Sequence, residues 1–263
     1  MTAPAPPFLA SPKPLAFAHR GGAAYAPNRD IENSLAAFDN AVRLGYRYLE
    51  TDARVSADGT VFAFHDATLD RTTDRRGTLA RLDATEVHRA RIGGREPIPL
   101  LRELLDAFPD ARFNIDVKDA ATVAPTLRVI EEAGATDRVC IASFSHRRLG
   151  QVRALAPHVT TSASPPEIAR VMAHPWRVLP ALRRTGVSCV QVPTRRGWLS
   201  IVTPKFVRAA HTLGLEVHVW TIDDPSEMAR LLDLGVDGLM TDRIDVLRDV
   251  LTARGLWTGG DPR

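Results

Sequence analysis

The sequence predicts a (β/α)₈ barrel, the TIM-barrel fold, with a short accessory hairpin inserted after the second strand. Short apolar runs typical of buried strands alternate with amphipathic runs typical of helices along the whole chain. About eight such pairs fit within 263 residues, the usual size of this fold. An open doubly wound sheet is the alternative, but the G-x-G-x-x-G turn that normally follows its first strand is missing.

The expected strands are short runs rich in apolar and β-branched residues, bounded by polar turns. The run Val61–Phe64 follows the turn sequence Ala57-Asp58-Gly59, so it is assigned to the accessory hairpin. The remaining runs are expected to form the barrel. They are Leu15–Ala18, Tyr46–Thr51, Arg112–Val117, Val139–Ala142, Val159–Ser162, Cys189–Val192, Glu216–Trp220 and Gly238–Met240.

Helices are expected between these strands because capping residues mark their ends. Ser34–Gly45 begins with a serine N-cap and ends with a glycine suited to the left-handed C′ position. Leu100–Phe108 follows Pro99, and proline is favourable in a first helical turn. The other candidates are Thr122–Gly134, Pro165–His174, Thr203–Gly214, Asp224–Gly235 and Arg243–Leu251.

One domain is expected over residues 15–255, after a disordered arm over residues 1–14 and before a tail over residues 256–263. The arm lacks the basic start and apolar segment of a secretory signal, and no run is long enough to span a membrane. We therefore expect a cytoplasmic protein without stable membrane insertion. Cys140 and Cys189 lie in apolar runs and are expected to be buried free thiols.

The charge pattern bears on possible partners. The net charge is +3, and the arginines are interleaved with acids instead of forming a basic cluster with aromatics. This pattern favours a solvated mixed-charge surface and argues against nucleic-acid binding. The sequence leaves the oligomeric state open.

Carboxylates stand at the expected strand ends, where barrel enzymes place catalytic groups. Glu50 and Asp52 lie at positions i and i+2 of a strand, so their side chains point to the same side. With Asp116 at the end of the next full strand, their repulsion would call for a cation. Carboxylates and water are ligands of Mg²⁺ and Ca²⁺, although a lone acid pair is more often a solvated edge or a cap partner.

Two histidines and two cations stand at the same strand ends. His19 and His65 titrate near neutrality, so one can act as a base and the other as an acid. Arg20 and Lys118 could neutralise an anion. Singly, His19 could cap a loop and His65 could belong to a turn. A metal, two histidines and two cations around one pocket together suit phosphoryl transfer on a diester.

Aromatic residues follow two other expected strands. Phe144 stands after the fourth strand, and Trp220 ends the seventh. Such aromatics pack in the core more often than they face a ligand. At a barrel mouth they can also contact substrate, so both are retained as substrate-binding candidates.

The ordered series of motifs resembles the glycerophosphodiester phosphodiesterase family. The resemblance spans about Leu15 to Leu251, and the series as a whole is more specific than any one motif. The matching segments are His19-Arg20-Gly21, Glu32-Asn33-Ser34, Glu50-Thr51-Asp52, Asp58-Gly59, His65-Asp66, Leu69-Asp70-Arg71-Thr72-Thr73, Val219-Trp220-Thr221 and Gly235–Asp242.

The resemblance implies a (β/α)₈ barrel that hydrolyses glycerophosphodiesters to sn-glycerol 3-phosphate and an alcohol, with one divalent cation, Mg²⁺ or Ca²⁺. A route through a cyclic phosphate is consistent with it. The implied roles are acid–base catalysis by His19 and His65, metal binding by Glu50, Asp52 and a third acid, and phosphate binding by Arg20 and Lys118.

Two departures from the family pattern affect this reading. Asp116 stands where the family commonly has glutamate; related sphingomyelinase D-like enzymes are similar in using aspartate there, so Asp116 is retained as the third acid. Ala26–Ile31 lengthens the lead into Glu32 and is expected to alter the loop at the pocket mouth.

Two other functions remain open. A lysophospholipase D or sphingomyelinase D-like enzyme would use the same site but would need an apolar mouth. Ala173–Leu182 with Arg183-Arg184 could border such a mouth. The third possibility is a non-catalytic barrel that binds a phosphorylated ligand.

Overall fold

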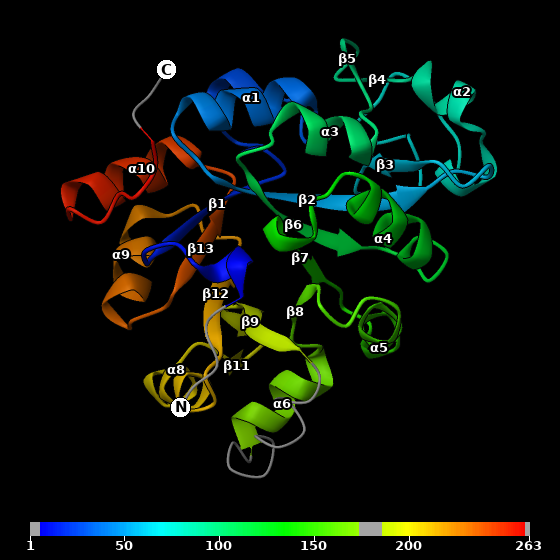
Figure 1. The fold of residues 1–263 in the computed structure, drawn as a ribbon. Coiled ribbons are helices and arrows are strands. Elements are labelled where there is room, and N and C mark those ends of the chain that lie inside the picture. The colour runs from blue at the N-terminus through cyan, green and yellow to red at the C-terminus, as the bar shows by residue number, and fades with distance from the viewer. Residues whose placement is uncertain (1–5, 174–185, 261–263) are drawn as a thin grey trace.

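A computed structural model describes residues 6–173 and 186–260, and in these ranges eight parallel strands close into a barrel (Figure 1). The strands follow the order β1-β13-β12-β9-β8-β7-β6-β2, and pairing between β1 and β2 closes the sheet. This confirms the predicted fold. The barrel strands are β1 (Leu15–His19), β2 (Tyr48–Val55), β6 (Arg112–Val117), β7 (Val139–Ala142), β8 (Thr160–Ser162), β9 (Val187–Pro193), β12 (Glu216–Trp220) and β13 (Gly238–Thr241).

The accessory hairpin is also confirmed. β3 (Val61–Ala63) pairs antiparallel with the end of β2, with Ala53 opposite Ala63. β2 therefore continues past Thr51, where the sequence prediction ended it, because its final residues gain a partner in β3.

The chain after β3 forms an insertion with its own small core. It contains α2 (Ala84–His88) and the two-residue strands β4 (Arg91–Ile92) and β5 (Glu96–Pro97). This core lies beside the end of β2 and supports the loop that carries His65. It consists of Phe62, Phe64, Leu69, Leu79, Val87, Ala90, Ile92 and Ile98.

Helices cover the outside of the barrel (Figure 1). The Ser34 side chain accepts a hydrogen bond from Ala37 N, as expected of an N-cap, and Gly45 has a φ of +96° after the helix. α5 was not predicted, because Gly150 and several arginines interrupt its apolar pattern. The helices are α1 (Leu35–Arg43), α3 (Leu101–Ala107), α4 (Val123–Glu132), α5 (His146–Leu155), α6 (Pro165–Ala173), α8 (Pro204–Thr212), α9 (Pro225–Asp233) and α10 (Ile244–Ala253). In the described ranges, none of them combines the length and the apolarity that crossing a bilayer requires.

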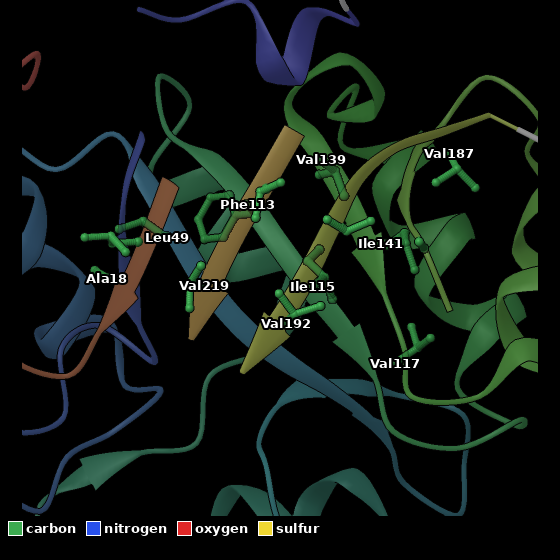
Figure 2. Packing of buried hydrophobic residues seen from close by; sticks show 14 of the residues in the cluster. Ala18, Leu49, Phe113, Ile115, Val117, Val139, Ile141, Val187, Val192 and Val219 are labelled. Atoms are coloured by element: carbon green, nitrogen blue, oxygen red, sulfur yellow. The ribbon is translucent and has the colours of Figure 1, made fainter. Parts of the chain in front are cut away.

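The main core is built from apolar side chains of the barrel strands and of the helices around them. Figure 2 shows part of it, including Phe113 and Ile115 of β6 and Ile141 of β7, all fully buried. Parallel strands buried on both faces need such continuous apolar runs, which is why the runs were readable in the sequence. Cys140 and Cys189 are buried and free, as predicted.

The segment before β1 corrects the prediction of a disordered arm up to Pro14. Pro7–Leu9 forms a 3₁₀ turn, and Phe8 and Leu9 are buried in a cluster with Phe17 and Tyr48. The Phe8 ring meets Tyr48 edge-on at 5.4 Å, and the Tyr48 hydroxyl donates to the Phe8 carbonyl at 2.7 Å. This cluster lies at the amino-terminal end of the strands, so the segment closes that end of the barrel.

We predict that Phe8→Ala lowers the free energy of unfolding by about 3 kcal/mol, because it removes a fully buried ring and leaves a cavity beside Tyr48. Urea denaturation measures the loss. Leu155→Ala, at a side chain 63% exposed, is the control and should cost less than about 0.5 kcal/mol. Equal losses in the two variants would show that the segment contributes no packing.

Candidate active site

A cleft of about 760 Å³ opens at the carboxyl ends of the barrel strands. The sequence predicted that all the candidate residues lie on one rim, and the lining of this cleft agrees with that prediction. It is lined by every predicted site residue: His19, Arg20, Glu50, Asp52, His65, Asp116, Lys118, Phe144 and Trp220.

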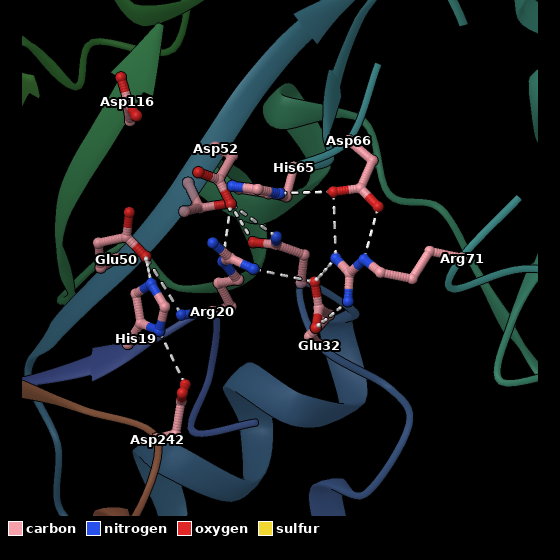
Figure 3. Close-up of polar contacts among 12 residues, drawn as sticks. His19, Arg20, Glu32, Glu50, Asp52, His65, Asp66, Arg71, Asp116 and Asp242 are labelled. Atoms are coloured by element: carbon pink, nitrogen blue, oxygen red, sulfur yellow. Dashed lines mark hydrogen bonds and ion pairs between the residues drawn. The ribbon is translucent and has the colours of Figure 1, made fainter. Parts of the chain in front are cut away.

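Strand register brings the ionisable residues together. His19 of β1 pairs in register with Glu50 of β2, and Asp52 of β2 pairs with Asp116 of β6. Because the strands are parallel, these four residues come from one end of three adjacent strands. Figure 3 shows Glu50, Asp52 and Asp116 on these neighbouring strands, with His19 beside Glu50.

Asp52 is the most heavily paired carboxylate. It is 1% exposed; Lys118 Nζ lies 2.7 Å from Asp52 Oδ1, and Arg20 Nε lies 3.2 Å from Oδ2. The Asn33 side-chain amide donates to Asp52 Oδ2 at 3.0 Å. Burial acts to raise the pKa of Asp52, but Lys118 and Arg20 outweigh it and the pKa is lowered. Asp52 is therefore ionised at neutral pH.

Glu50 and Asp116 are less well compensated. Burial, followed by repulsion from Asp52, raises the pKa of Glu50 to about 7. Burial also raises the pKa of Asp116, although Lys118 Nζ lies 2.7 Å from Asp116 Oδ2 and opposes that rise. Lys118 thus lies between Asp52 and Asp116, while in the described part of the chain the Glu50 carboxylate is met by His19 Nε2 at 3.7 Å and the Arg20 backbone amide at 3.3 Å.

His19 is oriented by the carboxylate of Asp242, which directly follows the last barrel strand, β13. Asp242 Oδ1 lies 2.7 Å from His19 Nδ1, which leaves Nε2 toward Glu50 (Figure 3). Burial acts to lower the pKa of His19, but Glu50 and Asp242 outweigh it and the pKa is raised. His19 therefore favours the protonated form.

His65 also lies beside a carboxylate, but its pKa is shifted in the opposite direction. Asp66 Oδ1 lies 2.6 Å from His65 Nδ1, and Arg71 pairs with Asp66 and with Glu32, which fixes the carboxylate (Figure 3). Burial lowers the pKa of His65; Asp52 and Asp66 oppose this, while Lys118 and Arg20 add to it. His65 therefore favours the neutral form.

The turn after β1 explains why two glycines follow Arg20. Arg20, Gly21 and Gly22 all have positive φ, at 50°, 86° and 91°. A Cβ at Gly21 would lie 2.8 Å from the Ala37 side chain, and one at Gly22 would lie 2.7 Å from Ile244. Only glycine fits both positions, so this turn aims Arg20 at the carboxylates.

The longer lead into Glu32 has a structural role beneath this turn. Asn28 is fully buried, and its amide donates to the carbonyls of Gly21 and Ala37 at 2.8 and 3.2 Å. None of the described residues from Ala26 to Ile31 lines the cleft. The direct effect of the longer lead is therefore on the turn that carries Arg20.

The aromatic candidates form a pair on the cleft wall. The rings of Phe144 and Trp220 meet edge-on at 5.6 Å, and Phe144 is 64% exposed. Both line the cleft, and the partly buried Trp220 also packs against the core cluster that contains Phe17. Most of the segment proposed to border an apolar mouth, residues 174–184, lies outside the described residues.

Sequence reasoning assigned no role to several residues that the structure places in or beside the site. Asn114 and Gln191 line the cleft and are joined by a 2.7 Å hydrogen bond. Asn114 could have been found from the sequence, because it lies two residues before Asp116 on the same strand and points to the same side. The residues that orient the two histidines lie in the segments that match the family pattern, but sequence analysis gave them no role. They are Glu32, Asp66, Arg71 and Asp242.

The donor set can be compared with the needs of a divalent cation. Among the described residues no three His, Cys, Asp or Glu side chains converge into a metal-binding group, because Lys118 holds Asp52 and Asp116. Two observations nevertheless fit a cation. Among the described residues the buried Asp116 Oδ1 has no hydrogen-bond partner, and burial together with repulsion from Asp52 raises the pKa of Glu50, which a bound cation would oppose. Carboxylate oxygens are also the ligands that hard cations prefer.

Comparison with known proteins agrees with this geometry. The sequence matches the glycerophosphoryl diester phosphodiesterase family over residues 19–246. It is 42% identical over 266 residues to a Mycobacterium tuberculosis protein called probable glycerophosphodiester phosphodiesterase 2, covering 98% of each chain.

Two solved structures share the fold. A glycerophosphodiester phosphodiesterase from Agrobacterium tumefaciens is 25% identical with a TM-score of 0.74, covering 89% of this chain and 98% of that one. An Oleispira antarctica phosphodiesterase, solved in complex with the product sn-glycerol-3-phosphate, is 24% identical with a TM-score of 0.77, covering 91% and 97%. With the family match across nearly the whole chain, we conclude that the protein belongs to the glycerophosphoryl diester phosphodiesterase family and is a phosphoric diester hydrolase.

Proposed function

We propose that the protein hydrolyses small glycerophosphodiesters to sn-glycerol 3-phosphate and an alcohol, using a divalent cation and histidine acid–base catalysis. The observation that carries this proposal is the pair His19 and His65, whose pKa values are shifted in opposite directions at one cleft. The Oleispira antarctica relative, with sn-glycerol-3-phosphate bound in the same fold, supports the choice of product.

The opposite shifts support one division of the proton-transfer roles. His65, with its lowered pKa, is the base that takes the proton of the attacking hydroxyl. The hydroxyl oxygen bonds to phosphorus, and the bond from phosphorus to the alcohol oxygen breaks. His19, with its raised pKa, donates its Nε2 proton to that leaving oxygen. In a route through a cyclic phosphate, the neighbouring glycerol hydroxyl attacks first and water then opens the ring with the two roles reversed.

The cations of the site bind the phosphoryl oxygens in this proposal. Lys118 Nζ has three protons and directs two toward Asp52 and Asp116, so the third is available to a phosphate oxygen. Arg20 is held beside it by Asp52 and Glu32. Charge-assisted hydrogen bonds from both side chains would strengthen as negative charge builds up in the transition state.

Glu50, Asp52 and Asp116 would hold the cation in this proposal, consistent with the unpartnered Oδ1 of Asp116. When bound, Mg²⁺ or Ca²⁺ would supply further neutralisation of the phosphoryl charge. Phe144 and Trp220, which line the same cleft, would cover the carbon atoms of the substrate.

We predict metal-dependent release of sn-glycerol 3-phosphate from a panel of glycerophosphodiesters, assayed with Mg²⁺, Ca²⁺, Mn²⁺ or a chelator. His19→Asn and His65→Ala should each lower kcat by about 10² to 10⁴, because each removes one proton transfer. His158→Ala, at an exposed histidine before β8, is the matched control and should keep full activity. Activity that survives both substitutions, or a chelator, would contradict the mechanism.

The metal assignment predicts a specific effect of Asp116. Asp116→Asn should raise the metal concentration needed for half-maximal activity by about tenfold or more, because it removes one anionic ligand. Asp116→Glu restores the carboxylate that the family commonly has and should retain metal activation. Asp119→Asn changes a nearby aspartate that pairs with Arg54 instead, and should leave the metal dependence unchanged. A metal titration of each variant, followed by product release, distinguishes these outcomes; equal shifts for Asp116→Asn and Asp119→Asn would refute the assignment.

A further inference from the structure

A small hairpin after β9 projects from the cleft rim. β10 (Arg195–Arg196) pairs antiparallel with β11 (Leu199–Ser200), and Gly197-Trp198 forms the turn. Every residue from Arg195 to Ser200 is exposed, and Trp198 is 88% exposed. Such a side chain adds almost no buried area to the fold, so packing does not explain it.

The exposed apolar residues are not scattered. Four large apolar side chains are exposed in the described part of the chain, and three of them belong to this rim. Phe144 and Leu199 line the cleft mouth, and Trp198 is next to Leu199 in the turn. The fourth, Leu155, lies at the far end of α5. Exposed apolar residues that gather at one place mark a contact surface more often than single ones do.

The same rim is basic. The segment from Pro193 to Arg208 contains Arg195, Arg196, Lys205 and Arg208 and no acid. The segment from Ser143 to His158, which carries Phe144, also has no acid, but its Arg153 is paired with Glu167, so the positive charge of the rim comes mainly from the hairpin. The chain as a whole has nearly balanced charge, so this side of the cleft mouth is locally positive.

We propose that this rim, defined as Phe144, Arg195, Arg196, Trp198 and Leu199, docks reversibly on a bilayer surface that carries anionic headgroups. The tryptophan and the two other apolar side chains would enter the interfacial layer, while the arginines would meet lipid phosphates. The rim binds through attraction to anionic headgroups and through shallow insertion of its apolar side chains. Binding is therefore weak and sensitive to salt.

Two observations favour a bilayer over other occupants. Trp198 is not among the residues that line the cleft, so it does not serve a substrate held there. Five side chains on a hairpin and one loop are also far fewer than the roughly 20–30 residues per side of a stable protein interface. The proposal concerns binding alone and does not depend on the reaction proposed above.

The test is co-sedimentation of the full chain with vesicles. We expect binding to vesicles of equal parts phosphatidylcholine and phosphatidylglycerol, little binding to phosphatidylcholine alone, and release by added salt. Tryptophan emission should shift to shorter wavelength on binding, and this shift should be lost in Trp198→Ser. Failure to bind the anionic vesicles would overturn the proposal, as would equal binding to both kinds of vesicle.

Matched variants separate the rim from general surface charge. Trp198→Ser, and the pair Arg195→Gln with Arg196→Gln, should each weaken vesicle binding by about tenfold. The controls are Leu155→Ser, an exposed apolar residue elsewhere, and Arg43→Gln with Arg102→Gln, which makes the same change in net charge on α1 and α3. The controls should bind like the wild type; equal weakening in controls and rim variants would overturn the proposal.

Discussion

The buried carboxylates at the barrel mouth are the constraint on which the rest of the site depends. Three acids at the ends of β2 and β6 are nearly excluded from water, at 6% exposure or less, and Arg20 and Lys118 form ion pairs with them. Burial, followed by repulsion from Asp52, raises the pKa of Glu50 to about 7, so keeping all three acids ionised costs free energy. A folded protein accepts this cost where the buried charge serves binding or catalysis.

The supporting residues can be understood as consequences of that constraint. Asn33 has a φ of +63° and is 1% exposed, yet it satisfies two neighbours, because it donates to Asp52 and accepts from the Thr51 hydroxyl at 2.8 Å. Asp242 and Asp66 then tune the two histidines from opposite sides of the array. The effect of Asp52 reaches His65 directly, which links the pKa of the base to the charge state of the carboxylates.

Much of the fold was readable from the sequence because its signals are local. Buried parallel strands need unbroken apolar runs, and Ser34 and Gly45 mark the ends of α1 through backbone chemistry alone. The burial of Phe8 was missed because it depends on Tyr48, which lies far away in the chain. The β10–β11 hairpin was missed because two-residue strands have no periodicity to detect.

The sequence predicted which residues belong to the site but not which of them pair with each other, and the reason is geometric. Strand ends identify which side chains share a rim, whereas the partner of Lys118 depends on side-chain reach across β2 and β6. Lys118 lies between Asp52 and Asp116, which sequence reasoning assigned to a cation, so in the proposed mechanism ammonium and metal would share these carboxylates. A bound phosphodiester would attract the third proton of Lys118 and so weaken the hold of its ammonium on the two carboxylates. Substrate and cation are expected to favour each other's binding through this one side chain.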